Sequence, residues 1–225
     1  PLARFSKFVW TNDETFTAKA EIANYGRRAL SGGARWTLTT AAGQAVASGT
    51  SPSLKAPIGE LTPLLDIRAP LTSLKQATQL KLTVALSGFE NSWDLWVYPK
   101  MLDAPVPSGV HVTATLDAAA RDTLAHGGKV LLLARNAGLP MDFQPVFWSL
   151  SWFPKQPGTM GLLCDPVHPA LTGFPTEGHS NWQWWDLTHD AHALILDGQP
   201  FGLRPVIQVI DDYHRNHRLG AVVEA

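Results

Sequence analysis

The chain has 225 residues, with 18 Lys and Arg against 19 Asp and Glu, nine Trp and a single Cys. This length suits one large or two small domains, and 45% apolar with 16% charged residues is a globular composition that excludes disorder. A net charge of −1 gives no electrostatic basis for binding nucleic acid or anionic membranes, and no apolar run reaches the roughly 20 residues of a membrane span.

The first hundred residues alternate between apolar and polar side chains, as half-buried strands do. Residues 16–22 and 80–86 show the alternation most clearly, and turn signals recur about every ten residues. Six or seven short antiparallel strands of this kind predict an immunoglobulin-like β-sandwich. We assign it to residues 1–101, because the stretch 99–109 holds three prolines without periodicity.

The second half, residues 102–225, has a different pattern. A strand over 110–115, an Ala-rich helix over 117–126 and a strand over 129–134 predict one βαβ unit. The run 129–134 is apolar on both faces, which is typical of a covered parallel strand. Further strands are expected at 161–164, 193–196, 206–210 and 220–223. We therefore expect an open, doubly wound, flavodoxin-like α/β domain, truncated at its end.

Five of the nine tryptophans fall between positions 148 and 185. Aromatic rings stack on the apolar faces of sugars, and amide, carboxylate and imidazole groups bond their hydroxyls. The alternative is that these rings fill a core or the seam between domains. The candidate sugar-binding residues are Trp148, Trp152, His179, Asn181, Trp182, Trp184 and Trp185.

Glu177 and Asp186 flank the densest Trp stretch and suggest a pair of catalytic carboxylates, as glycoside hydrolysis requires. The alternatives are a helix N-cap for Asp186 and a surface hydrogen bond for Glu177.

Histidines three residues apart occur twice, at His189 with His192 and at His214 with His217. With Asp211 and Asp212 they could hold a metal, but the spacing matches no zinc signature, and solvated histidines are the alternative. The lone Cys164 excludes an internal disulfide and a cysteine-rich zinc site. Pro166 follows it closely, so a nucleophile turn is not expected, and no Gly-rich phosphate loop follows a strand. No metal or other cofactor is expected.

Several stretches together resemble the C-terminal part of bacterial, β-galactosidase-like proteins of glycoside hydrolase family 2. The stretches are 1–5, 9–14, 147–153, 162–171, 174–177, 179–185 and 206–212, with Asn216 and 219–220. The resemblance implies an immunoglobulin-like module and a class I glutamine amidotransferase-like α/β domain that follow a catalytic (β/α)8 barrel. The family's two catalytic glutamates belong to that barrel, which nothing here resembles. The strand over 130–134 is followed by residues 135–138 without a Cys, so amidotransferase chemistry is not expected.

The chain begins at Pro1 without a Met or signal peptide and ends on an apolar run, so we expect a piece of a larger protein. We predict a non-catalytic accessory region of a family 2 glycoside hydrolase, in the periplasm or secreted. Its partners would be the catalytic domain of the same parent chain and an oligosaccharide, with no nucleic acid or membrane. Two alternatives stay open. One is a free-standing hydrolase that uses Glu177 with Asp186 or His179, and the other is a structural spacer.

Overall fold

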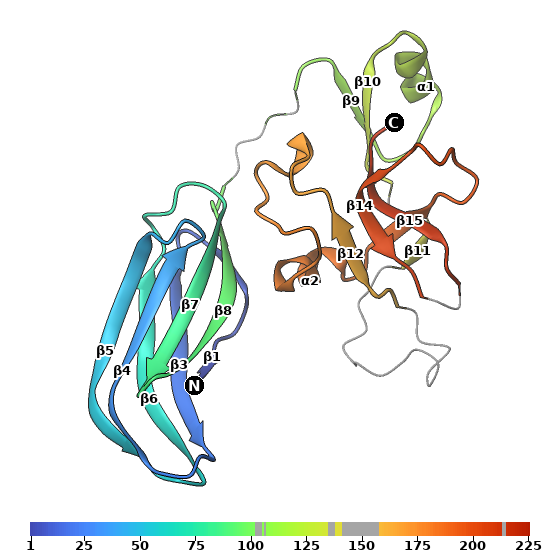
Figure 1. The fold of residues 1–225 in the computed structure, drawn as a ribbon. Coiled ribbons are helices and arrows are strands. Elements are labelled where there is room, and N and C mark those ends of the chain that lie inside the picture. The colour runs from blue at the N-terminus through green and yellow to red at the C-terminus, as the bar shows by residue number, and fades with distance from the viewer. Residues whose placement is uncertain (102–104, 106, 135–137, 141–157, 213–214) are drawn as a thin grey trace. The chain divides into compact units, whose positions relative to one another are not determined.

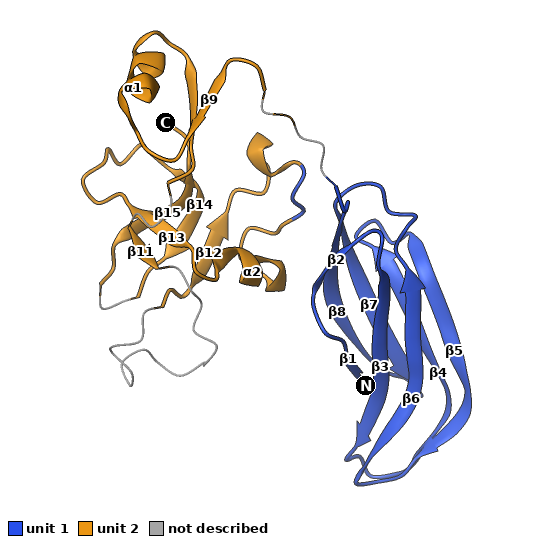
Figure 2. Ribbon diagram, turned by 180° about the vertical axis from the view of Figure 1, so that it is seen from behind, with its two compact units in different colours: residues 1–102, 173–175 blue, residues 103–172, 176–225 orange. Residues whose placement is uncertain are grey.

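A computed structural model describes residues 1–101, 105, 107–134, 138–140, 158–212 and 215–225. The chain forms two compact units, residues 1–102 with 173–175 and residues 103–172 with 176–225 (Figure 2). No helix of the described residues is long and apolar enough to cross a membrane.

The first unit is built from two β-sheets (Figure 1). One sheet has the order β1 (Leu2–Arg4), β3 (Thr15–Asn24) and β6 (Glu60–Pro70). The other has the order β2 (Val9–Thr11), β8 (Phe89–Tyr98), β7 (Thr78–Leu86), β4 (Leu30–Thr40) and β5 (Ala45–Ala56). Neighbouring strands are antiparallel except β2 and β8, which are parallel. The predicted β-sandwich is confirmed.

Period-two alternation puts the apolar residues of both sheets into one core. Residues 16, 18, 20 and 22 of β3 are buried, as are 80, 82, 84 and 86 of β7. Phe16 is fully buried and packs edge to face against Trp10, with ring centroids 5.3 Å apart. Trp36 lies so close to Gly49 that a Cβ there would be 2.6 Å from the indole Nε1. Only glycine fits at that place on β5.

The edge strand β5 pairs with β4 through an irregular stretch. The register shifts between Gly33 and Arg35, where Ser51 and Pro52 lie opposite Ala34. The hydroxyl of Ser51 accepts a hydrogen bond from the Ala34 N–H at 2.9 Å and donates one to the Pro52 carbonyl at 2.8 Å. A side chain therefore replaces the ladder bond that this bulge interrupts.

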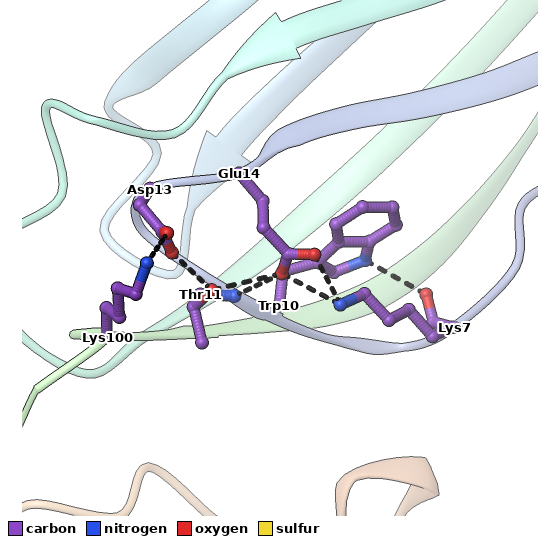
Figure 3. A network of polar contacts seen from close by, with 6 residues as sticks. All are labelled: Lys7, Trp10, Thr11, Asp13, Glu14 and Lys100. Carbon is purple, nitrogen blue, oxygen red and sulfur yellow. Dashed lines mark hydrogen bonds and ion pairs between the residues drawn. The ribbon is translucent and has the colours of Figure 1, made fainter.

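A polar network folds the chain between β1 and β3 onto itself (Figure 3). The Lys7 ammonium donates to both Glu14 oxygens at 2.6 and 2.8 Å and lies 4.8 Å from the centre of the Trp10 ring. The Thr11 N–H donates to the same carboxylate at 2.8 Å. The Lys7 hydrogen bonds lower the pKa of Glu14.

The same segment holds the chain where it leaves β8. The N–H of Asn12 donates to the Tyr98 carbonyl at 2.9 Å, and its Oδ1 accepts from the Lys100 N–H at 3.1 Å. Lys100 also pairs with Asp13 at 2.6 Å, which lowers the pKa of that carboxyl (Figure 3). Asn12 and Asp13, near the start of the first unit, thus hold Tyr98 and Lys100 at its end.

The second unit begins with the predicted βαβ element. Strand β9 (Val110–Thr113) and strand β10 (Lys129–Leu132) are parallel and joined by helix α1 (Ala118–Ala125), as expected. Asp117 caps the helix by accepting from the Ala120 N–H at 2.8 Å. The run 129–134 was expected to be buried on both faces. This is not found, since Leu131 and Leu133 are 49% and 51% exposed.

The other strands form a five-stranded sheet. Its order is β11 (Leu139–Pro140), β13 (His192–Ile195), β15 (Arg218–Val223), β14 (Pro205–Ile210) and β12 (Gly161–Cys164). The expected positions of β12 to β15 are confirmed, but every pair in this sheet is antiparallel. Parallel neighbours need a long crossover, whereas β14 ends at Ile210 and β15 begins soon after, at Arg218. The prediction of a doubly wound, amidotransferase-like domain is therefore corrected to an antiparallel sheet with one βαβ element.

Candidate functional site

The Trp-rich segment is held along the edge strand β12. The N–H of Cys164 donates to the Gly178 carbonyl at 2.9 Å, and the N–H of Ser180 donates to the Leu162 carbonyl at 3.1 Å. The Ser180 hydroxyl accepts from the Leu162 N–H at 3.1 Å, and Leu163 forms an antiparallel bridge with His179. Residues 178–180 therefore run beside β12 like a short added strand, which fixes where the tryptophans begin.

Two short helical turns then present the tryptophans. The first is η3 (Trp182–Trp184), and it continues into α2 (Trp185–Thr188). The Asn181 side chain caps η3 by accepting from the Trp182 N–H at 2.7 Å. The Thr188 hydroxyl lies 2.9 and 3.0 Å from the carbonyls of Trp184 and Trp185. Both ends of the turn are thus held by side-chain bonds.

The three indoles of this turn have different surroundings. Trp184 is 5% exposed and donates its Nε1–H to the Thr176 hydroxyl at 3.1 Å, so it is a packing residue. Trp182 and Trp185 are 56% and 40% exposed. Their ring centroids lie 6.4 Å apart with the planes inclined at 46°. Leu187 of α2 is also exposed. The turn therefore offers two neighbouring indoles to solvent and buries the third.

The polar candidates lie around the same segment. His179 is exposed, and its Nδ1 is 3.1 Å from the Ser180 carbonyl. Glu177 is half-buried and Asp186 is exposed. The alternative role of Asp186 as a helix N-cap is wrong, because Asp186 lies inside α2, whose N-cap position is Trp184.

The thiol of Cys164, on β12, lies close enough to Glu177 to interact with its charge. Burial raises the pKa of this thiol, a hydrogen bond with Thr176 lowers it, and the negative charge of Glu177 raises it. The net shift is upward, so the protonated thiol is favoured and the nucleophilic thiolate is not.

The histidine candidates lie on different parts of the second unit. His189 directly follows the tryptophan turn, and its N–H donates to the Trp185 carbonyl at 3.1 Å. His189 is exposed beside Asp190, with Nε2 and Oδ2 3.5 Å apart, and His192 is half-buried on β13. His217 bonds Asp197, with Nδ1 and Oδ2 2.6 Å apart. Among the residues that the structure describes, no three His, Cys, Asp or Glu side chains come together as metal ligands would. His214, Trp148 and Trp152 lie outside the described residues.

The sequence missed the role of Asp211, whose side chain is only 1% exposed. Its Oδ1 accepts from Arg215 Nη2 at 2.6 Å, from Arg215 Nε at 3.1 Å and from the Asp212 N–H at 2.7 Å. Its Oδ2 accepts from the His217 N–H at 2.9 Å. Arg215 also donates to the Gly158 carbonyl at 2.9 Å. This carboxylate holds Asp212, Arg215 and His217 together between β14 and β15. In the sequence, an Asp directly after an apolar strand pattern, with an Arg four residues later, is the signal that could have identified it.

Comparison with known proteins gives two family matches. Residues 111–225 match a domain of unknown function (DUF8487), and residues 14–99 match another domain of unknown function (DUF8488). No curated protein matches the chain.

One solved structure that is similar to part of this chain is a cycloisomaltooligosaccharide glucanotransferase of Paenibacillus sp. complexed with cycloisomaltoheptaose. It is 12% identical, with a TM-score of 0.35, and the alignment covers 55% of this chain and 17% of that enzyme. A similarity of this size carries no argument about fold or function.

Proposed function

Because the chain belongs to the DUF8487 family, whose description assigns no activity, we propose a function from the chain's own residues: a non-catalytic, saccharide-binding accessory region. The observation that carries this proposal is the exposed pair Trp182 and Trp185 on one turn. The sequence resemblance supports a family 2 glycoside hydrolase as parent, acting in the periplasm or outside the cell. In such a parent, an immunoglobulin-like first unit and the second unit would support the catalytic barrel.

Exposed indoles are costly for a fold that gains nothing from them. A tryptophan side chain can bury roughly 150–250 Å² of surface, worth about 25 cal/mol per Å² of apolar area. Trp182 and Trp185 leave much of this gain unused, although Trp184, between them, is fully packed. Neighbouring apolar groups left in water are typical of a binding surface.

The turn also suits saccharide by its geometry. An indole is a flat apolar surface on which the C–H face of a pyranose can lie, and the inclined planes allow two consecutive sugar rings to tilt against each other. Asn181 and Thr188 fix the backbone of the turn, which reduces the entropy lost on binding. A shallow site of this kind gives about 4–5 kcal/mol, or a Kd of roughly 0.2–1 mM.

Calorimetric titration with neutral β-galactoside oligosaccharides tests this function. We expect Trp182→Ala and Trp185→Ala each to weaken binding at least about tenfold, because each removes a stacking surface worth at least about 1.4 kcal/mol. Phe89→Ala is the matched control, since Phe89 is an exposed aromatic residue of the first unit, and it should leave binding unchanged. Wild-type protein that binds none of these saccharides, or Trp variants that bind as well as wild type, would refute the proposal.

The hydrolase alternative is tested with an aryl β-galactoside. We expect no turnover, because the catalytic glutamates of the proposed parent lie on its barrel. Turnover by the wild type that is lost in Glu177→Gln would instead favour a free-standing hydrolase that uses Glu177.

A further inference from the structure

A groove of about 540 Å³ lies on the first unit, beside the three-stranded sheet. Ligand sites commonly have volumes of roughly 300–1,000 Å³. The groove is lined by residues of β1 and the segment after it, by β3 and by β6. It lies wholly within the first unit, so it is separate from the tryptophan turn.

The strand pairing explains why a groove forms there. Arg4 of β1 lies opposite Lys19 of β3, and Lys19 lies opposite Asp66 of β6. In the next row on the same face, Thr17 lies opposite Arg68, but β1 has already ended and offers no third side chain. Side chains directly opposite have Cβ atoms about 5 Å apart. The departure of β1 therefore leaves a gap in a surface of closely spaced charged and polar groups.

The charges of the groove are unequal and largely uncompensated. Arg4, Lys19 and Arg68 are cationic, and Asp66 is the single anionic lining residue. Among the described residues, neither Lys19 nor Arg68 takes part in an ion pair or a side-chain hydrogen bond. Arg4 uses its Nε for Glu21, at 2.5 Å. The Lys19 and Arg68 cations and the outer nitrogens of Arg4 thus line the groove outside any ion pair of the described residues, and the groove carries an excess of positive charge over the single carboxylate of Asp66.

The other lining groups suit a polyhydroxylated ligand. Phe5 lines the groove and is half-buried, and its ring is held by contacts with Phe8 and Phe16 at centroid distances of 5.0 and 5.8 Å. The hydroxyls of Ser6 and Thr17 can exchange hydrogen bonds with a sugar, and the Asp66 carboxylate can accept one from a sugar hydroxyl. The same carboxylate disfavours a multiply charged phosphate by like-charge repulsion.

We propose that this groove binds an acidic saccharide, with the carboxylate of a uronic acid residue between Lys19 and Arg68. Arginine and lysine form strong, charge-assisted bonds to carboxylate, and the guanidinium of Arg68 can do so with two parallel bonds. The choice of a saccharide over other carboxylates rests on the proposed function, but the site and its residues are independent of the tryptophan turn. The full chain would then hold an anionic glycan at one unit and a neutral one at the other.

Titration of the full chain with trigalacturonate, beside a neutral trigalactoside of the same linkage, tests the groove. At low salt the double variant Lys19→Gln/Arg68→Gln should bind trigalacturonate at least about tenfold more weakly than wild type. The matched control is Arg35→Gln/Lys81→Gln, which removes the same charge from exposed positions of the other sheet and should bind within about twofold of wild type. In wild type, the amide NMR shifts that move with trigalacturonate should be those of Thr17, Ala18 and Ile67.

Four outcomes would overturn the inference. They are no binding of trigalacturonate, equal weakening in both double variants, equal binding of the neutral trigalactoside in the groove, and shifts confined to residues outside it. The two proposals fail separately. Loss of trigalacturonate binding in Trp182→Ala would overturn the groove and leave the tryptophan site standing. Wild-type protein that binds trigalacturonate but no neutral saccharide would overturn the tryptophan site and leave the groove standing.

Discussion

Replacement of Asp211 should destabilise the second unit more than its position outside the strands and helices suggests. Its carboxylate is 1% exposed and accepts four hydrogen bonds, two from Arg215 and two from backbone N–H groups. Removing one partner of a buried ion pair costs about 3–5 kcal/mol. Because the Arg215 side chain is 30% exposed and can be rehydrated, we expect Asp211→Ala to cost about 3 kcal/mol. Asp211→Asn keeps the volume and one acceptor, so it should cost about 1.5–2 kcal/mol.

Amide hydrogen exchange of β14 and β15 measures this effect locally, without assuming that both units unfold together. A loss of 3 kcal/mol speeds exchange of these amides by roughly 150-fold. Asp186→Ala is the control, since Asp186 is an exposed carboxylate of the same unit, and it should stay within about 0.5 kcal/mol of wild type. If Asp211→Ala exchanges like the control, or if Asp211→Asn is as unstable as Asp211→Ala, the buried carboxylate is not what holds Asp212, Arg215 and His217 together.

Three further predictions concern stability. Since Lys7 lowers the pKa of Glu14, the charged carboxylate stabilises the first unit above the ordinary value of 4.5, and this contribution is lost as the pH falls below it. Unfolding free energies measured across that range should therefore depend less steeply on pH in Glu14→Gln, and an unchanged slope would contradict the role of the pair. Leu38→Ala empties a fully buried position and should cost about 3–4 kcal/mol in urea unfolding, against under about 1 kcal/mol for the half-exposed Leu61→Ala. Asp117→Ala removes the cap of α1 and should cost about 1 kcal/mol by exchange of the helix amides, whereas Asp117→Asn should cost much less.

The positions of the strands were predictable because the pattern of apolar residues that marks a strand lies within a few consecutive positions of the chain. Alternation over residues 16–22 and 80–86 marks β3 and β7, and the short apolar runs mark β12, β14 and β15. The direction of pairing is not a local property. The run from Val130 to Leu133 reads as a strand covered on both faces, but its partner β9 is one short strand and the leucines remain exposed. The apolar pattern of a strand shows which of its side chains could be buried, but it does not show which other elements lie beside the strand or cover it.

The candidate site shows the same limit at the level of single side chains. Trp182, Trp184 and Trp185 fall within a stretch of four residues, and no periodicity indicates which of them points inward. The answer depends on where η3 passes into α2 and on the hydroxyl of Thr176, eight residues earlier, that receives the Trp184 indole N–H. Asp211 likewise suggested a metal ligand, whereas its partner is the guanidinium of Arg215.

The bulge at Pro52 affects how readily the edge strand β5 can pair with a strand of another polypeptide. A strand at the border of a sheet offers a free row of amide and carbonyl groups, and a second polypeptide can add to it and start aggregation. Proline has no amide hydrogen, and the neighbouring Lys55 is charged, so β5 is a poor template for such growth. Copies of this unit are therefore hindered from pairing with one another through β5.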